Sequence, residues 1–210
     1  MNEQTKDRIR ALLEGIGYDH RHWTRPEPYR VCTQWVRELG LSELDALEIS
    51  PGQYWRTLPF KSYRGAGYPE FDICERTLDD RFDLIIADQV WEHLLWPYRA
   101  TRNVYDMLRP GGYFLNLTPF LIKVHEVPID CSRWTELGMK HLLAESGFPL
   151  ESVRTGSWGN RACVKANLRR GWARRGFFGS LANEPSFPVT VWALARKPVD
   201  PTAPGPVITG

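Results

Sequence analysis

The stretch at residues 81–119 constrains the fold more than any other part of the chain. Its first apolar run, at 83–87, shows no alternation of apolar and polar residues, which is typical of a parallel strand buried on both faces. A helix is predicted at 97–108, because Pro97 suits a first helical turn. A Pro-Gly-Gly turn and a second apolar run, at 113–117, follow it. Strand, helix and strand in this order predict a parallel sheet of the α/β class.

The remaining chain continues the alternation of strands and helices. We therefore expect one doubly wound α/β sheet with helices on both faces. The N-terminal helices and a loop at 1–40 should pack on a main domain at 41–197, and the Pro-rich tail at 198–210 should be disordered. Further helices are expected at 3–14, 28–39, 134–146 and 160–172, and further strands at 44–49, 60–64, 71–74, 150–155 and 187–195.

Overall charge and cysteine spacing exclude several classes of protein. The formal net charge is only +2, which argues against nucleic acid or an anionic membrane as a partner. The segment LRRGWARRGFFG could contact phosphates, but a solvated helix is the simpler interpretation. No apolar run reaches the length of a membrane span, and the charged N-terminus lacks the apolar core of a signal peptide, so we expect a cytoplasmic protein. Four cysteines without a CxxC pair argue against a structural zinc site.

Three segments, in order, resemble motifs of class I S-adenosylmethionine-dependent methyltransferases. FDLIIADQVWEHL resembles the fourth-strand motif of that family, and LRPGGYFLNLTP resembles the fifth-strand motif. HEVPIDCSRWTELGMKHLLAESGF resembles the following helix entry in relatives among polysaccharide and natural-product enzymes. The resemblance covers residues 28–196. It implies a seven-stranded Rossmann-like sheet whose last strand is antiparallel, with S-adenosyl-L-methionine across the carboxyl ends of strands one, two and four.

The resemblance also implies a set of cofactor-binding residues, with two departures from the family pattern. Ser50 and Tyr54 stand where glycines are usual in the turn after the first strand, and glycines there permit close approach to a ligand. A ribose-binding carboxylate is expected about 20 residues later, and none is present. The cofactor-binding residues that we predict are Glu48, Ser50, Pro51, Gly52, Tyr54, Asp72, Ile73, Asp88 and Gln89.

Histidines are the predicted bases, because methyl transfer to a hydroxyl requires removal of a proton. His93 follows the fourth strand and His125 follows the fifth, although either could instead brace a loop. Asp130 and Arg133 could bind an acceptor or form an ion pair at a helix entry. The predicted substrate-binding residues are Glu92, Asp130, Arg133, Trp134, His22 and Trp23. A metal site formed by His93, His125, Glu126 and Asp130 is conceivable, but no ligand spacing requires it, and we expect none.

These inferences lead to one functional hypothesis and three alternatives. The hypothesis is an S-adenosylmethionine-dependent methyltransferase that acts on a hydroxyl of a small molecule, a sugar or a glycoconjugate. Nine tryptophans favour a sugar acceptor, because indole faces stack on sugar rings. The alternatives are an N-methyltransferase, a nucleic-acid methyltransferase, and a non-catalytic binding protein on the same fold. The missing carboxylate and Tyr54 favour the last of these. No sequence feature defines an oligomeric state.

Overall fold

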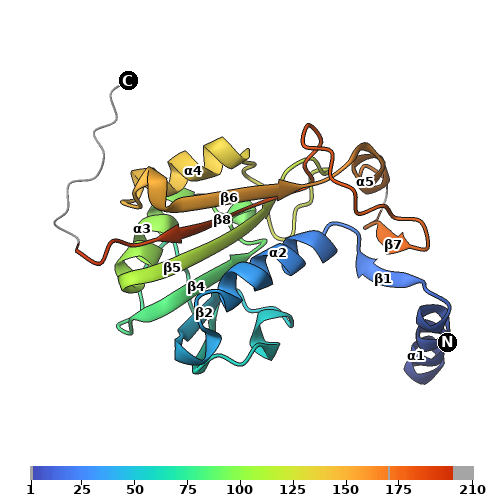
Figure 1. The fold of residues 1–210 in the computed structure, drawn as a ribbon, viewed down its shortest axis with the longest axis horizontal. Helices are drawn as coiled ribbons and strands as arrows, with labels where there is room; N and C mark the ends of the chain where they lie inside the picture. Colours follow the sequence, from blue (N-terminus) through green and yellow to red (C-terminus); the bar gives the residue numbers. More distant parts are fainter. Residues whose placement is uncertain (1, 170, 201–210) are drawn as a thin grey trace.

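Within the described residues, 2–169 and 171–200 of the computed structural model, a six-stranded mixed sheet forms the centre of the protein (Figure 1). Its strand order is β3-β2-β4-β5-β8-β6. The four strands from β3 to β5 are parallel, and β8 runs antiparallel to both β5 and β6. The strands are β2 (Asp45–Ile49), β3 (Ser62–Ala66), β4 (Phe82–Asp88), β5 (Leu108–Pro119), β6 (Val153–Trp158) and β8 (Thr190–Arg196).

The sheet confirms the predicted α/β architecture with an antiparallel last strand, but its described part has six strands rather than seven. The expected strand at residues 71–74 is a turn. Phe71 and Ile73 are both buried, so the apolar character of this segment serves the core. Asp72 accepts a hydrogen bond from the Cys74 amide at 2.8 Å, and this local bond favours a turn over sheet pairing.

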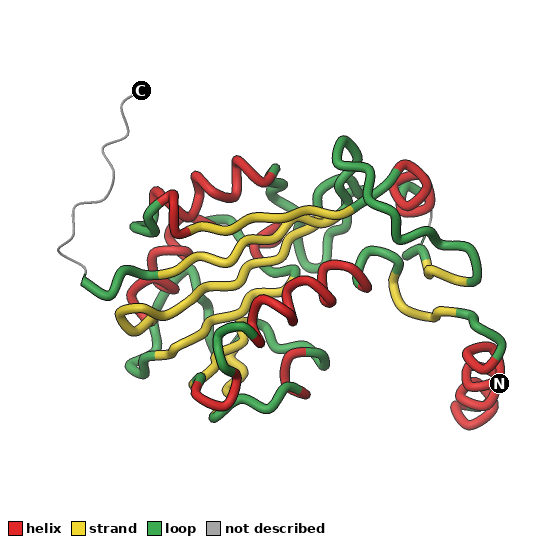
Figure 2. Tube along the Cα trace, in the orientation of Figure 1, coloured by secondary structure: helices red, strands yellow, loops and turns green. Residues whose placement is uncertain are grey.

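Helices cover both faces of the sheet, as predicted (Figure 2). On one face, α2 (Pro26–Arg37) buries Cys32, Trp35 and Val36. On the opposite face, α3 (Pro97–Met107) and α4 (Glu136–Glu145) bury a second apolar cluster. The 3₁₀ turns are Leu41–Glu43, Trp55–Thr57, Trp91–His93 and Leu150–Ser152. Among helices of the described residues, none combines the length and apolar content that a membrane span requires.

Two segments at the edge of the fold differ from expectation. A two-stranded antiparallel sheet joins β1 (Asp19–His22) to β7 (Arg174–Gly176), where charged residues carry no strand pattern. As a result α5 (Arg161–Asn167) is shorter than the predicted helix at 160–172. The N-terminal helix α1 (Glu3–Gly15) forms as predicted and lies at the end of the molecule beyond β1 (Figure 1). The predicted tail at 198–210 lies outside the described residues from 201 onward.

Candidate active site

The carboxyl ends of three parallel strands meet at one edge of the sheet. Ile49 of β2 is in register with both Ala66 of β3 and Ala87 of β4. A groove of about 650 Å³ crosses these ends, and we call it the strand-end groove. Its lining includes the predicted residues Ser50, Asp72, Ile73 and Gln89, together with Phe71 and His93. Ligands of open α/β sheets bind at this kind of edge.

The turn after β2 keeps a glycine-like backbone without the usual glycine. Ser50 has φ +54°, in the left-handed region, and its amide donates to the Ala66 carbonyl at 2.8 Å. Gly67 lies so close that an added Cβ would stand 3.0 Å from the Ser50 Cα. Glu48 is 1% exposed and accepts hydrogen bonds from the Gly52 amide at 2.8 Å and from a tyrosine hydroxyl. Burial raises the pKa of the Glu48 carboxyl, and the carboxyl braces the turn.

Tyr54 faces away from the strand-end groove. Its ring stacks on Tyr29 of α2 with centroids 4.0 Å apart, and its hydroxyl lies 2.8 Å from the Thr33 hydroxyl. The chain then forms the 3₁₀ turn Trp55–Thr57. Tyr54 therefore anchors this turn to α2, and it leaves the groove open.

The two residues after β4 point to different places. Asp88 accepts hydrogen bonds from Arg25 at 2.7 Å, from the Tyr29 hydroxyl at 2.8 Å and from the Trp55 indole at 3.2 Å. These donors hold the Asp88 side chain toward α2. Gln89 has φ +60° and lines the strand-end groove, and its buried Nε2 has no hydrogen-bond partner among the described residues. Of this predicted pair, only Gln89 offers a free polar group to a ligand.

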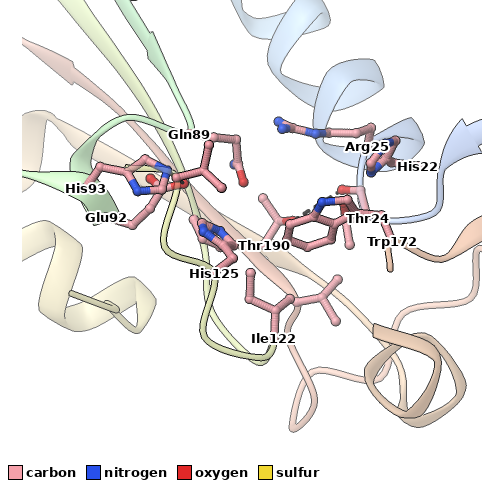
Figure 3. A pocket seen from close by; sticks show the side chains of 13 residues that line it. His22, Thr24, Arg25, Gln89, Glu92, His93, Ile122, His125, Trp172 and Thr190 are labelled. Carbon is pink, nitrogen blue, oxygen red and sulfur yellow. Dashed lines mark hydrogen bonds and ion pairs between the residues drawn. The ribbon is translucent and has the colours of Figure 1, made fainter. Parts of the chain in front are cut away.

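A second cavity of about 280 Å³ adjoins the groove, and we call it the histidine cavity (Figure 3). Figure 3 shows Glu92, His93 and His125 on one side of it, and His22, Arg25 and Trp172 on the other. The strand-end groove and the histidine cavity share Gln89, His93 and Val127 in their linings. A molecule in the groove and a second molecule in the cavity would therefore meet at these three residues.

Three of the cavity residues form a compact group, the Glu92–His93–His125 cluster. Glu92 is 0% exposed, and neither carboxylate oxygen has a hydrogen-bond partner among the described residues. Desolvation raises the pKa of Glu92 to about 8. His93 Nε2 lies 3.6 Å from Glu92 Oε1, while His93 Nδ1 is hydrogen-bonded to the Ile129 carbonyl. Burial lowers the pKa of His125, whose ring centroid lies 5.0 Å from that of His93.

The other predicted acceptor residues have mixed positions. Asp130 accepts a hydrogen bond from the His125 amide at 2.8 Å and pairs with Arg133 through both carboxylate oxygens, so this pair braces the loop that carries His125. Trp23 is buried, and its indole donates to the Ser180 carbonyl at 3.0 Å. Trp134 packs on the apolar core beside α3 and α4. These four residues therefore stabilise the surroundings of the cavity.

Arg25 and Trp172 are among the residues of the cavity lining that were not predicted from the sequence. Arg25 lies next to the predicted His22 and Trp23, and its Arg-rich, aromatic loop was the only signal. Trp172 lies in the segment LRRGWARRGFFG, which we interpreted as a solvated helix. The structure instead places its ring 5.2 Å from the His125 ring, in an edge-on arrangement. Proximity of residues so far apart in the chain has no local sequence signal.

Comparison with known proteins identifies the class of this fold. Residues 31–116 match a family model described as a methyltransferase domain. A methyltransferase from Thermotoga maritima, a possible histamine N-methyltransferase, has 13% identity, covers 78% of this chain and 86% of its own, and has a TM-score of 0.52. One from Archaeoglobus fulgidus has 12% identity, 80% and 94% coverage, and a TM-score of 0.52.

A third similar structure contains the demethylated cofactor. It is phosphoethanolamine N-methyltransferase 2 of Haemonchus contortus, in complex with phosphomonomethylethanolamine and S-adenosylhomocysteine. Its identity is 11%, the match covers 81% of this chain and 53% of that one, and the TM-score is 0.52. No curated protein sequence matches the chain. Residues 31–116 are thus similar to a methyltransferase domain, and the fold is similar to that of S-adenosylmethionine-dependent methyltransferases. Both similarities support S-adenosylmethionine as the cofactor.

The strand-end groove fits this cofactor in its chemistry. Phe71 and Ile73 contribute apolar atoms to the lining, on which adenine would pack, and Gln89 lines the groove and has a buried Nε2 without a hydrogen-bond partner among the described residues. Ser50 supplies the glycine-like backbone that lets a ligand approach the turn. One departure remains, since Ala66 leads directly into Gly67 at the end of β3 without a ribose-binding carboxylate. When bound, the cofactor supplies an electrophilic methyl group on a sulfonium.

Proposed function

We propose that this protein transfers a methyl group from S-adenosylmethionine to a hydroxyl of a small molecule or a sugar-containing acceptor bound in the histidine cavity. The observation that carries the proposal is the shared lining of groove and cavity at Gln89 and His93. A methyl donor in one and a nucleophile in the other would approach each other there, as in-line displacement requires. A cytoplasmic location, expected from the sequence, stays a prediction.

A histidine of the cluster is the proposed general base. A hydroxyl is a poor nucleophile until its proton leaves, and a neutral imidazole accepts that proton near pH 7. Burial keeps the pKa of His125 low, so its ring is neutral at that pH. His93 donates through Nδ1 to the Ile129 carbonyl, which leaves Nε2 as the free acceptor. Both residues therefore offer a ring nitrogen that could accept the proton.

The aromatic wall of the cavity supports a sugar-containing acceptor. Trp172 lines the cavity and is 42% exposed, so its ring has surface to offer a ligand. Apolar ring faces pack on aromatic side chains, and the hydroxyls of a sugar need polar partners beside them. His22 and Thr190 supply such groups in the same lining.

Two experiments test the proposal. Calorimetric titration with S-adenosylmethionine should detect binding, and absence of binding at millimolar cofactor would overturn it. Assays with methyl-labelled cofactor and a panel of sugars, phenols and amines should then give label on oxygen, located by mass spectrometry. His93→Ala and His125→Ala should each lower turnover about 100-fold or more with cofactor affinity nearly unchanged. His141→Ala, at an exposed position of α4, is the matched control.

Two alternatives have specific support. N-methylation has support from the two structurally similar N-methyltransferases, and label on nitrogen in the acceptor panel would establish it. A non-catalytic binding role has support from the short connection Trp55–Thr57 and the absence of a carboxylate at the end of β3. Failure to bind the cofactor, with a properly folded protein, would favour that role.

A further inference from the structure

We propose that the Glu92–His93–His125 cluster binds one divalent first-row transition-metal ion whose open coordination positions face the histidine cavity. The inference deepens the proposed function. It rests on that function in one respect, which is that the group coordinated by the ion would be the acceptor hydroxyl. Metal binding itself requires only the three side chains and their geometry.

The spacing of the ligand atoms suits one ion. One ligand atom from each of the three side chains lies within 4.8 Å of the others, and His93 Nε2 is 3.6 Å from Glu92 Oε1. Two ligands about 2.1 Å from an ion at a tetrahedral angle lie about 3.4 Å apart. His93 Nε2 and Glu92 Oε1 are thus already about as far apart as two ligands of one ion. Movement of His125 by about 1 Å would complete the set.

Glu92 supplies the second observation, because a fully buried carboxyl group must either keep its proton or have its charge compensated. Neither of its oxygens has a hydrogen-bond partner among the described residues. The nearby cations are already paired, Arg25 with Asp88 at 2.7 Å and Arg133 with Asp130. A buried carboxylate without a partner is costly, and coordination of a metal ion is one of the ways in which proteins compensate it.

The orientation of His93 is also that of a metal ligand. Its Nδ1 is hydrogen-bonded to the Ile129 carbonyl, which places the lone pair on Nε2 toward Glu92. Metal-binding histidines usually donate their other ring nitrogen in this way, and the bond fixes the tautomer and the ring. The loop that carries His125 is held by the hydrogen bond from its amide to Asp130.

The donor set indicates which ions would bind. Two imidazoles and one carboxylate suit Zn²⁺, Fe²⁺, Co²⁺ or Mn²⁺, whereas Mg²⁺ and Ca²⁺ prefer oxygen ligands alone. Three protein ligands leave at least one position open, and the adjoining cavity is where an acceptor oxygen would reach it. With the ion bound, a coordinated hydroxyl would lose its proton to water at a lower pH; without it, the proton would pass to an imidazole. Metal occupancy would therefore change the pH profile of the transfer.

The experiment uses the untagged full-length protein with Co²⁺ and Zn²⁺ as probes. Calorimetry should give one ion per chain, and Co²⁺ should produce visible absorption bands of a low-coordinate site with nitrogen ligands. Glu92→Gln and His125→Gln should each weaken binding at least tenfold, whereas His141→Ala should bind as the wild type does. Circular dichroism checks that each variant folds. If Glu92→Gln fails to fold, His125→Gln at its partly exposed position carries the test.

Each outcome has a definite meaning. The inference is overturned if the Co²⁺ bands are absent at about 100 μM Co²⁺, a concentration at the weak end of protein affinities for divalent ions. It is also overturned if wild type, Glu92→Gln and His125→Gln bind the ion equally. Loss of binding in His141→Ala would place the ion elsewhere and overturns it too. Metal binding without methyl transfer would overturn the proposed function alone. Methyl transfer by a protein that binds no ion would overturn the metal site alone.

Discussion

Replacing Glu92 by glutamine should make the protein less sensitive to alkaline pH. Desolvation raises the pKa of Glu92 to about 8 in the folded protein, whereas the ordinary value is 4.5. The folded state therefore holds a proton that the unfolded chain has lost, and stability falls as pH rises from about 4.5 to about 8. Glutamine has nearly the same shape and no charge, so the variant lacks this loss.

The expected size follows from the two pKa values. Each unit of pKa difference corresponds to about 1.4 kcal/mol. The raised pKa of Glu92 thus destabilises the folded state by about 1 kcal/mol at pH 5 and by about 4 kcal/mol at pH 8. The free energy of unfolding of Glu92→Gln, relative to wild type, should therefore increase by about 3 kcal/mol between these pH values.

Urea unfolding at pH 5, 6, 7 and 8, followed by tryptophan fluorescence, measures this difference. A chelator must be present, because a bound cation would keep Glu92 ionised at lower pH. Glu145→Gln, at an exposed position at the end of α4, is the control and should follow the wild-type curve. A constant difference between Glu92→Gln and wild type from pH 5 to pH 8 would refute the reasoning, since it would mean that Glu92 is solvated in the fold.

Three further substitutions test other parts of the structure by thermal or chemical unfolding. Asp88→Asn should lower the free energy of unfolding by about 2 kcal/mol or more, because the partly buried Arg25 loses its partner. Asp80→Asn, at an exposed ion pair, should cost less than about 1 kcal/mol, and equal losses would contradict this. Gly159→Ala should cost more than about 2 kcal/mol, because its Cβ would stand 2.1 Å from a backbone carbonyl oxygen, and Gly15→Ala, which meets nothing within 4 Å, should be tolerated. Ser50→Gly should leave stability within about 1 kcal/mol and should not weaken cofactor binding, because relief of the left-handed backbone offsets the entropy of glycine; a lower cofactor affinity would show that the hydroxyl binds the ligand.

The central stretch was predictable because its signals are local. The unbroken apolar run before Asp88 and the proline at the start of α3 predict β4 and α3 to within a residue or two. The predicted strand at 71–74 was wrong because the prediction also rested on local apolar content. Phe71 and Ile73 are buried, but they are not paired in the sheet. Local apolar content predicts burial more reliably than it predicts hydrogen-bond partners.

Only those residues of the candidate site that directly follow a predicted strand could be placed from the sequence. His93 and His125 follow neighbouring parallel strands, so their meeting in one cavity could be expected from the sheet alone. Tyr54 and Asp88 could not be oriented from the sequence, because the packing of α2 decides where both side chains point. Trp172 entered the cavity through the pairing of β7 with β1, and that pairing has no sequence pattern.

The sequence by itself determined the order in which strands and candidate site residues follow one another along the chain. A buried strand comes first, then the polar run from Asp88 to His93, and then a second strand followed by His125. Apolar periodicity and turn residues determine the structure of only a few neighbouring residues, so their effect can be recognised from the sequence. Only the tertiary structure decided that the Glu92 carboxyl is buried without a hydrogen-bond partner among the described residues, while two imidazoles lie beside it. That outcome depends on which distant groups exclude water and which cations are already paired, and burial and pairing are properties of the whole packed chain.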